Sequence, residues 1–312
     1  KGAPWAPFVF QEQYVASMPI WVRQAGDKTE TWHFRETARL AKSYETDRYL
    51  AALLAPASSR QALISLYGLS AEMVRIRRVV GEPQLAAMRM QFWLDALPHI
   101  ANGEPPAHPL ALSLAATFDK WGNSGVSDLS RLIEAHQTAL GSGPYATLDE
   151  LNSFLDLTSS NLTALAIGLV KPHSFRLDSG GLAQAGGRAW GLLQLVLSNP
   201  EHSVQDWWWI PTELLNAAGI RRSELVSQRW SEAAAALATR LADLIARDLV
   251  KARNEFRRWP SETGPAVMHL AVCAPFLKKI RSTTPSRGTQ EISLSMLQRQ
   301  FAVLWGGLKG RF

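Results

Sequence analysis

One stretch decides the fold of this chain: Leu66-Tyr67-Gly68-Leu69-Ser70-Ala71-Glu72-Met73-Val74-Arg75-Ile76-Arg77-Arg78. Its apolar residues recur at three- and four-residue spacing, the period of one helix face, and the pattern extends from Leu63 to Val80. Gly81-Glu82-Pro83 follows, and glycine and proline both interrupt helices. The stretch is therefore predicted to be one long helix with a run of arginines near its end.

This helix resembles a catalytic helix of the squalene/phytoene synthase family, which reads roughly Leu-Tyr-Ala-Phe-x-x-Glu-x-Asp-Asp-x-x-Asp. In that family the aspartates hold magnesium against a prenyl diphosphate. In this chain the three acidic positions fall on Val74, Arg75 and Arg78. The resemblance therefore implies the scaffold of an enzyme without its metal site.

Four further segments resemble the same family in the same order, and the similarity covers roughly residues 41–312. The order and spacing of these segments, more than any one of them, carry the resemblance. They are Asp47–Ala57, Arg89–Leu97, Trp209–Leu215 and Phe276–Ile280.

A second metal motif of the family, Asp-x-x-x-Asp, falls on Ser198 and His202 when it is counted back from Pro211. Acids at positions i and i+4 share one helix face and can converge on a metal, and magnesium prefers hard oxygen ligands. Serine and histidine do not supply such a pair. The resemblance thus predicts no catalytic residue, no metal and no cofactor.

Composition limits the other classes of function. The net charge is +6 and the pI about 9.6, but the basic residues are dispersed and no nucleic-acid module is recognisable, so no nucleic-acid partner is expected. The single cysteine, Cys273, cannot form a disulfide framework or a zinc site. Only 19% of residues are charged while twelve are tryptophan, which favours a protein that hides surface in an assembly.

The chain is predicted to be all-α, with residues 1–40 as an extended, proline-rich arm and residues 41–312 as a single orthogonal helical bundle of the isoprenoid synthase type. No apolar run reaches the roughly 18 residues of a membrane-spanning helix. The clearest helix is Glu232–Arg258, with Ser231 as its cap and Leu237, Leu241 and Phe256 on its buried face. The other helices are expected at about 37–54, 84–101, 110–120, 127–139, 147–169, 182–197, 265–281 and 293–306.

Several aromatic residues are candidates for a partner or membrane interface, because such side chains are enriched there. One group lies in the arm and one at a run of three tryptophans that cannot all face one core. The alternatives are an arm packed on its own domain and tryptophans filling the cavity mouth. The candidates are Trp5, Phe8, Trp21, Trp207, Trp208, Trp209 and Trp305.

Arg75 and Arg78 have two interpretations. If they face the cavity, their guanidinium groups are suited to binding a phosphate or a lipid headgroup. Ion pairs with Glu72, Glu82 or Asp95, or contacts at a partner interface, are the favoured interpretation, because a buried guanidinium requires an anion nearby.

Within the family, the chain resembles a non-catalytic branch, the phytoene-synthase-like assembly factors of mitochondrial respiratory complex I, in Met88-Arg89-Met90-Gln91-Phe92-Trp93 and Phe276-Leu277-Lys278-Lys279-Ile280. This resemblance implies a protein on the matrix side of the inner membrane. It would act as an assembly factor or accessory subunit, with protein subunits of a large membrane complex as partners and with lipid contact. The alternatives are a protein that binds a lipid or isoprenoid in the cavity, and an active prenyl-diphosphate synthase.

Overall fold

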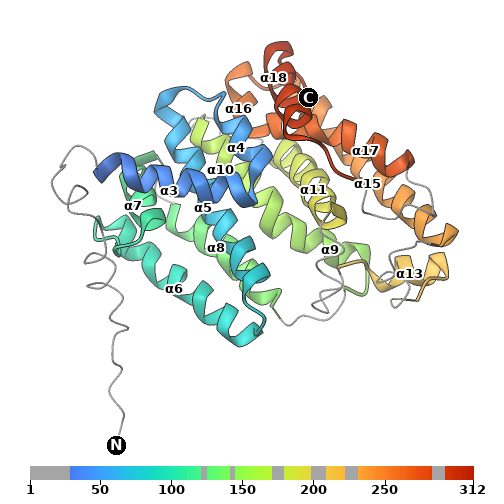
Figure 1. Cartoon of the computed structure of the whole chain (residues 1–312), viewed down its shortest axis with the longest axis horizontal. Coiled ribbons are helices and arrows are strands. Elements are labelled where there is room, and N and C mark those ends of the chain that lie inside the picture. The colour runs from blue at the N-terminus through green and yellow to red at the C-terminus, as the bar shows by residue number, and fades with distance from the viewer. Residues whose placement is uncertain are drawn as a thin grey trace, which may run out of the picture.

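The computed structural model describes residues 29–120, 125–140, 145–170, 179–197, 209–221, 231–282 and 292–312. Every regular element in these ranges is a helix, which confirms the all-α prediction. Figure 1 shows α5, α10 and α11 crossing the middle of the molecule, with α6 and α8 on one side and α15 and α17 on another.

The first helices form one end of the molecule. Within this end, α3 packs against α5 and α7. Helix α5 contains the stretch that decides the fold and ends at Val79, as its sequence predicts. The elements are α3 (Thr29–Tyr44), α4 (Thr46–Ala52), α5 (Ala57–Val79), α6 (Pro83–Ala101), α7 (Pro109–Ala116) and the short η1 (Phe118–Lys120).

The predicted end of the arm at residue 40 is wrong, because α3 already begins at Thr29, while residues 1–28 of that arm lie outside the described residues. Its buried face carries His33, Thr37 and Ala41, so an apolar period is hard to see in the sequence. Thr37 instead makes a 2.8 Å hydrogen bond between its Oγ1 and Oγ of Ser113 in the interior. A Cβ at Gly68 would lie 2.6 Å from the Thr37 methyl, so glycine allows α5 to approach α3 closely.

The central helices meet α11 at short distances. A Cβ at Gly187 would lie 2.2 Å from Cα of Ser160, so only glycine fits there and α11 approaches η2 closely. The expected helix at 147–169 is interrupted by a π-helical turn, η2. The elements are α8 (Gly125–Thr138), α9 (Leu148–Leu155), η2 (Asp156–Ser160), α10 (Asn161–Val170) and α11 (Ser179–Leu197).

The C-terminal helices complete the bundle. Helix α15 buries Leu237, Leu241 and Phe256, and Oγ of Ser231 accepts a hydrogen bond from the backbone N–H of Ala234, as expected. The segment expected as one helix at 265–281 is broken into short pieces around Pro265. The elements are α13 (Thr212–Ala218), α15 (Glu232–Phe256), η4 (Ser261–Thr263), α16 (Gly264–Val267), η5 (Met268–Val272), α17 (Cys273–Ser282) and α18 (Met296–Lys309).

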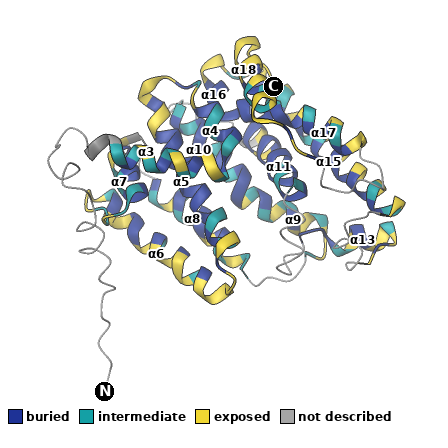
Figure 2. Ribbon diagram, viewed as in Figure 1, coloured by how far each residue is buried: buried dark blue, intermediate teal, exposed yellow. Residues whose placement is uncertain are grey.

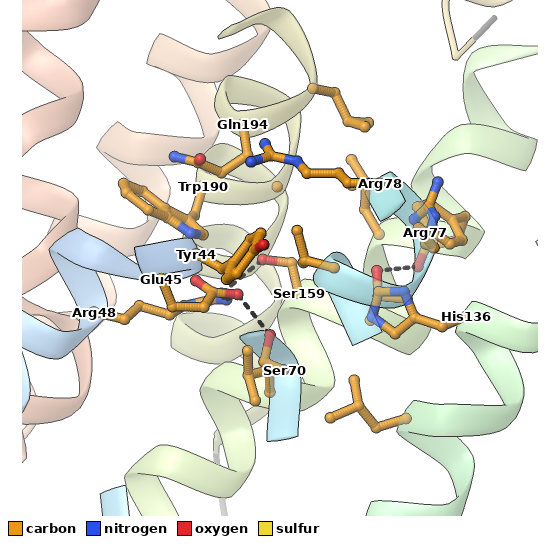
Figure 3. Close-up of a pocket in the computed structure, with 18 residues that line it drawn as sticks. Tyr44, Glu45, Arg48, Ser70, Arg77, Arg78, His136, Ser159, Trp190 and Gln194 are labelled. Carbon is orange, nitrogen blue, oxygen red and sulfur yellow. Dashed lines mark hydrogen bonds and ion pairs between the residues drawn. The ribbon is translucent and has the colours of Figure 1, made fainter. Parts of the chain in front are cut away.

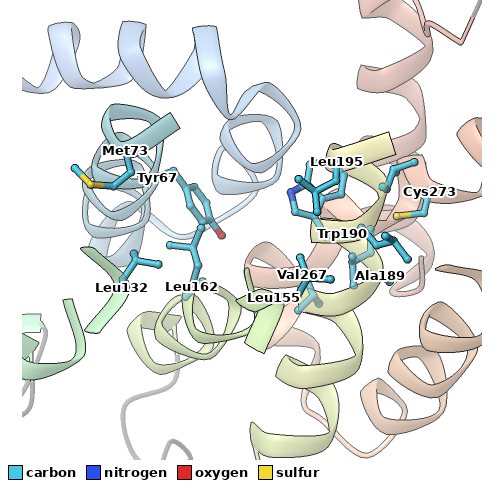
Figure 4. Packing of buried hydrophobic residues seen from close by; sticks show 14 of the residues in the cluster. Tyr67, Met73, Leu132, Leu155, Leu162, Ala189, Trp190, Leu195, Val267 and Cys273 are labelled. Atoms are coloured by element: carbon cyan, nitrogen blue, oxygen red, sulfur yellow. The ribbon is translucent and has the colours of Figure 1, made fainter. Parts of the chain in front are cut away.

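A large apolar core joins both ends of the molecule. Figure 4 shows Tyr67 and Met73 of α5 facing Leu132 and Leu162, while Trp190 lies nearer to Val267 and Cys273 on the far side of the same cluster. Because helices distant in the chain share this core, the described residues of the bundle form one packing unit.

One continuous helical run, Leu148–Val170, is long and apolar enough to cross a membrane by length and composition, with a mean hydropathy of 1.3. The sequence prediction that no run is long enough missed it, because polar residues at η2 interrupt the apolar pattern. Of the 18-residue window that meets this criterion, 56% is buried inside the molecule, and the run packs against α11. That burial is typical of a core helix.

Candidate functional site

The inner face of α5 borders a cavity of about 130 Å³. Ser70, Val74 and Arg78 line it from α5, as expected for residues four apart on one helix face, and Arg77 adjoins them. The other walls come from α3, α4, α8, α9, η2, α10 and α11. Figure 3 shows the Arg78 side chain reaching across the cavity toward the helix that carries Gln194.

A buried ion pair closes one side of this cavity. Nη1 of Arg48 lies 3.3 Å from both carboxylate oxygens of Glu45, and both side chains are less than a tenth exposed. The hydroxyl of Ser70 donates to Glu45 over 2.5 Å, and Nη2 of Arg48 donates to Oγ of Ser159 over 2.9 Å. Glu45 stands at the junction of α3 and α4, and its partners lie in α4, α5 and η2, so the network ties these segments together around the cavity.

Two arginines occupy the other side. The guanidinium carbon of Arg77 lies 5.7 Å from the centre of the Phe154 ring, and that of Arg78 lies 6.0 Å from the centre of the Tyr44 ring. Burial lowers the pKa of Arg77 to about 10, so the group keeps its charge at neutral pH. This side of the cavity, its mouth, therefore carries two positively charged side chains, and the related catalytic helix would place an aspartate at the position of Arg78.

Arg75 takes a different direction from its neighbours. Its Nε and Nη2 donate to the two carboxylate oxygens of Glu72 over 2.8 and 2.7 Å, and these hydrogen bonds raise the pKa of Arg75. Arg75 does not line the cavity. The interpretation of Arg75 as half of an ion pair with Glu72 is confirmed.

The residues at this site do not fit magnesium. Val74 offers no ligand atom, and Arg75 and Arg78 bring positive charge. The carboxylates close by are already engaged: Glu45 pairs with Arg48, and Asp156 pairs with Arg188 at 2.5 Å. Among the described residues, no three histidines, cysteines or acids are grouped as a metal would require.

Two uncharged nitrogen groups also line the cavity. Nδ1 of His136 and Nε1 of Trp190 are buried and have no hydrogen-bond partner within the described ranges. Burial lowers the pKa of His136 to about 3, and Arg77 and Arg48 contribute to the shift, so the imidazole is neutral at physiological pH. Neither nitrogen group is an oxygen ligand of the kind that magnesium prefers.

Sequence reasoning missed the ion pair that dominates the site. Glu45 and Arg48 are three residues apart and stand beside the quoted Asp47–Ala57 segment, and a charged pair entering an apolar helical pattern was the available signal. Their partners Ser70 and Ser159 are 25 and 111 residues away from the residues they contact. Spacing along the chain does not reveal such contacts.

The predicted interface residues divide into three groups. Trp209 is buried at 5% exposure, so its assignment to an interface is wrong; it packs in the core beside Ile210 and Leu214. Trp305 is half exposed on α18. The remaining candidates, together with the second-motif positions, lie outside the described residues: Trp5, Phe8, Trp21, Ser198, His202, Trp207 and Trp208.

Comparison with known proteins places this geometry in context. The sequence model described as squalene/phytoene synthase matches residues 41–298. Proteins named NADH dehydrogenase (ubiquinone) complex I, assembly factor 6, are similar along most of the chain. The mouse protein is 24% identical over 78% of this chain and 72% of its own length, and the cattle protein is 24% identical over 79% and 73%.

A solved dehydrosqualene synthase in complex with a ligand has the same fold. It superposes with a TM-score of 0.73 at 14% identity, over 90% of this chain and 97% of its own. The prediction of an isoprenoid-synthase-type bundle is therefore confirmed.

Proposed function

The chain belongs to the squalene/phytoene synthase family, and on that premise we propose that it is a non-catalytic member that acts in the assembly of mitochondrial respiratory complex I, as an assembly factor or accessory subunit. The observation that carries the non-catalytic part is the charge of the cavity mouth. Val74 and Arg78 line the cavity at two of the positions where the family's helix carries aspartates, and Arg77 adds a second positive charge beside them. The nearby Glu45 is committed to Arg48.

The chemistry of the family depends on a metal acting as a Lewis acid on a diphosphate leaving group. Providing that metal from this site would require carboxylates that are free to bind it. Although burial works in the opposite direction, hydrogen bonds from Arg188 and Gln184 keep the pKa of Asp156 below its usual value. That carboxylate is thus fixed as an internal ion-pair partner.

The assembly role is supported by relatives that align with most of this chain. The mouse and cattle proteins, whose names state assembly of complex I, align over more than two thirds of their own lengths. From that role follows the proposed location, the matrix side of the mitochondrial inner membrane, with subunits or assembly intermediates of complex I as partners.

The cavity gives little support to the alternative of a lipid- or isoprenoid-binding protein. Its volume of about 130 Å³ is below the roughly 300–1,000 Å³ of ordinary small-molecule sites. Its walls also contain a buried ion pair and two arginines. Placing a long hydrocarbon chain against these charges would cost free energy, because the chain offers them no hydrogen bond in place of water.

Deletion of the gene tests the assembly role. We expect native gels of mitochondrial membranes from deleted cells, stained for NADH dehydrogenase activity, to lose the complex I band while the other respiratory complexes remain. The intact chain should restore the band. An unchanged complex I band in the deleted cells would overturn the proposed role.

The non-catalytic part has its own test. Purified chain incubated with geranylgeranyl diphosphate and magnesium should release no diphosphate and form no prenyl product. Sustained turnover would refute this part of the proposal and leave the gel result to be judged separately.

A further inference from the structure

Helix α18 presents a row of large apolar side chains to solvent. Leu297, Phe301, Leu304, Trp305 and Leu308 are between 48% and 83% exposed. Their spacing of four, three, one and three residues puts them on one face, here called the outer face of α18. Figure 2 shows this helix exposed along the upper edge of the molecule, beside the C-terminus.

The opposite side of α18 is firmly attached, so the outer face is held in place. Val303 and Gly306 are buried, and a Cβ at Gly306 would lie 3.1 Å from Cβ of Ala271. Nη1 of Arg299 lies 2.9 Å from the buried carboxylate of Asp47. A capping box at Ser295 begins the helix, and Gly310 ends it in the left-handed conformation.

Positive charge lies at one end of the outer face. The sequence of α18 contains no aspartate or glutamate. Nζ of Lys309 lies 4.4 Å from the centre of the Trp305 ring, at the end of the apolar row. Beside it lies an open groove of about 740 Å³ whose lining includes Arg257, Lys309 and Arg311 and no acidic residue.

We propose that α18 docks this protein on an anionic lipid bilayer. The outer face of α18 enters the boundary between headgroups and acyl chains, and Arg257, Lys309 and Arg311 contact lipid phosphates. An amphipathic helix with leucine and aromatic residues on one side and basic residues beside them has the chemistry of a membrane-surface helix. Trp305 suits the interface, since tryptophan is enriched at that depth.

The length of α18 decides how it lies on the bilayer. With 14 residues it is shorter than the roughly 20 that a spanning helix needs. Its inner face is also held against the molecule, where Gly306 packs on Ala271 and Arg299 pairs with Asp47. It therefore lies in the plane of the surface. The proposed function enters only in the choice of membrane, which would be the mitochondrial inner membrane.

A second exposed apolar row, on α6, differs from the row on α18 in its surrounding charges, and this difference favours a lipid partner for α18. Helix α6 exposes Leu85, Met88 and Phe92. The charges on this helix and at its start are of both signs, with Arg89 beside Glu82 and Asp95. A face with mixed charges has no particular complementarity to an anionic bilayer, and it serves as the matched control.

The test is co-sedimentation of the purified full chain with vesicles of phosphatidylcholine alone, or of phosphatidylcholine mixed with phosphatidylglycerol. The wild type should bind the anionic vesicles, and the binding should weaken with added salt. The triple variant Phe301→Ser, Leu304→Ser, Leu308→Ser should lose binding by about tenfold or more. The triple variant Leu85→Ser, Met88→Ser, Phe92→Ser should bind like the wild type.

The charge is tested separately. The triple variant Arg257→Gln, Lys309→Gln, Arg311→Gln should bind anionic vesicles about tenfold or more weakly than the wild type. Its preference for anionic over neutral vesicles should disappear. Circular dichroism of each variant checks that the helical fold is retained.

A site-specific reporter makes the result independent of folding losses. Cys273 is the chain's only cysteine and is buried, so a Leu308→Cys variant can be labelled selectively with an environment-sensitive dye. Its emission should shift to the blue on anionic vesicles, while the dye on Met88→Cys should not respond.

Three outcomes would overturn the inference. The first is a wild type that ignores anionic vesicles, and the second is an α18 variant that binds them as well as the wild type does. The third is self-association through the outer face without vesicle binding, which would assign the face to a second copy or another protein. Because no complex I is present in these assays, their failure would leave the deletion experiment intact.

Discussion

The cavity beside α5 and the outer face of α18 differ in whether their side chains find partners within the described part of the chain. In the cavity, Glu45 and Arg48 neutralise each other within the chain. On α18, Leu304 and Leu308 face outward and the described part of the chain does not cover them. A buried pair of charges that is already matched has little capacity left for a ligand, whereas an exposed apolar row gains free energy when a partner covers it. The difference supports the proposal that this protein acts through its surface and not through its cavity.

The largest expected effect is the loss of the cavity ion pair. Arg48→Met should destabilise the fold by roughly 3–5 kcal/mol, because it leaves the buried Glu45 carboxylate without its counter-charge. Urea denaturation followed by circular dichroism measures the change.

The exposed pair of Arg39 and Glu36 is the matched control, with Arg39 72% exposed. Arg39→Met should change the stability by less than about 0.5 kcal/mol. Equal small effects of both substitutions would mean that water reaches the cavity pair.

The second effect contrasts two sides of a single helix. Leu241→Ala on the buried face of α15 should cost roughly 2–5 kcal/mol through lost burial and a remaining cavity. Val250→Ala, at a half-exposed position of α15, should stay within about 0.5 kcal/mol. A cost well under 1 kcal/mol for Leu241→Ala would show that this face is not part of the core.

The third effect concerns Asp47, which joins the interior to α18. Burial raises the pKa of Asp47 to about 6, against the opposing charge of Arg299. Between about pH 4 and pH 6 the folded state therefore holds a proton that the unfolded state has released. This contribution to stability is fully present below pH 4 and is lost as the pH rises through 6.

The measurement is the stability of the wild type minus that of Asp47→Asn at each pH. This difference should fall by on the order of 3 kcal/mol from pH 4 to pH 7, since one pKa unit corresponds to about 1.4 kcal/mol. A difference that rises with pH would show that the ion pair with Arg299 outweighs burial.

The smallest expected effect is on the outer face of α18. Leu304→Ser should change the free energy of unfolding by less than about 0.5 kcal/mol, because the residue is already exposed. A loss above about 1 kcal/mol, measured by the same denaturation, would mean that another part of the chain covers this face in solution.

The sequence predicts the helices whose pattern is local. The register of α5 and the buried face of α15 follow from apolar spacing, and both are confirmed. The close approach of α11 follows from its glycines, since Gly187 meets the backbone of Ser160.

The remainder depends on contacts between distant segments. The sequence does not reveal the start of α3 because the inner face of this helix carries the polar residues His33 and Thr37. The hydroxyl of Thr37 finds its partner in Ser113, 76 residues away. The two sides of α18 are both apolar, so the sequence does not reveal that Val303 faces inward and Leu304 outward. Trp209 looked like a surface residue among three tryptophans, and only packing against other helices shows that it is buried.

The most direct test of the central claim compares the two regions in cells that lack the gene for this chain. One group receives Val74→Phe, which fills part of the cavity of about 130 Å³, and the other receives Phe301→Ser, Leu304→Ser, Leu308→Ser. Assembled complex I is then measured on native gels. We predict that Val74→Phe restores the complex I band to the wild-type level and that the α18 variant does not. Loss of the band with a folded Val74→Phe protein, and full restoration by the α18 variant, would contradict the account.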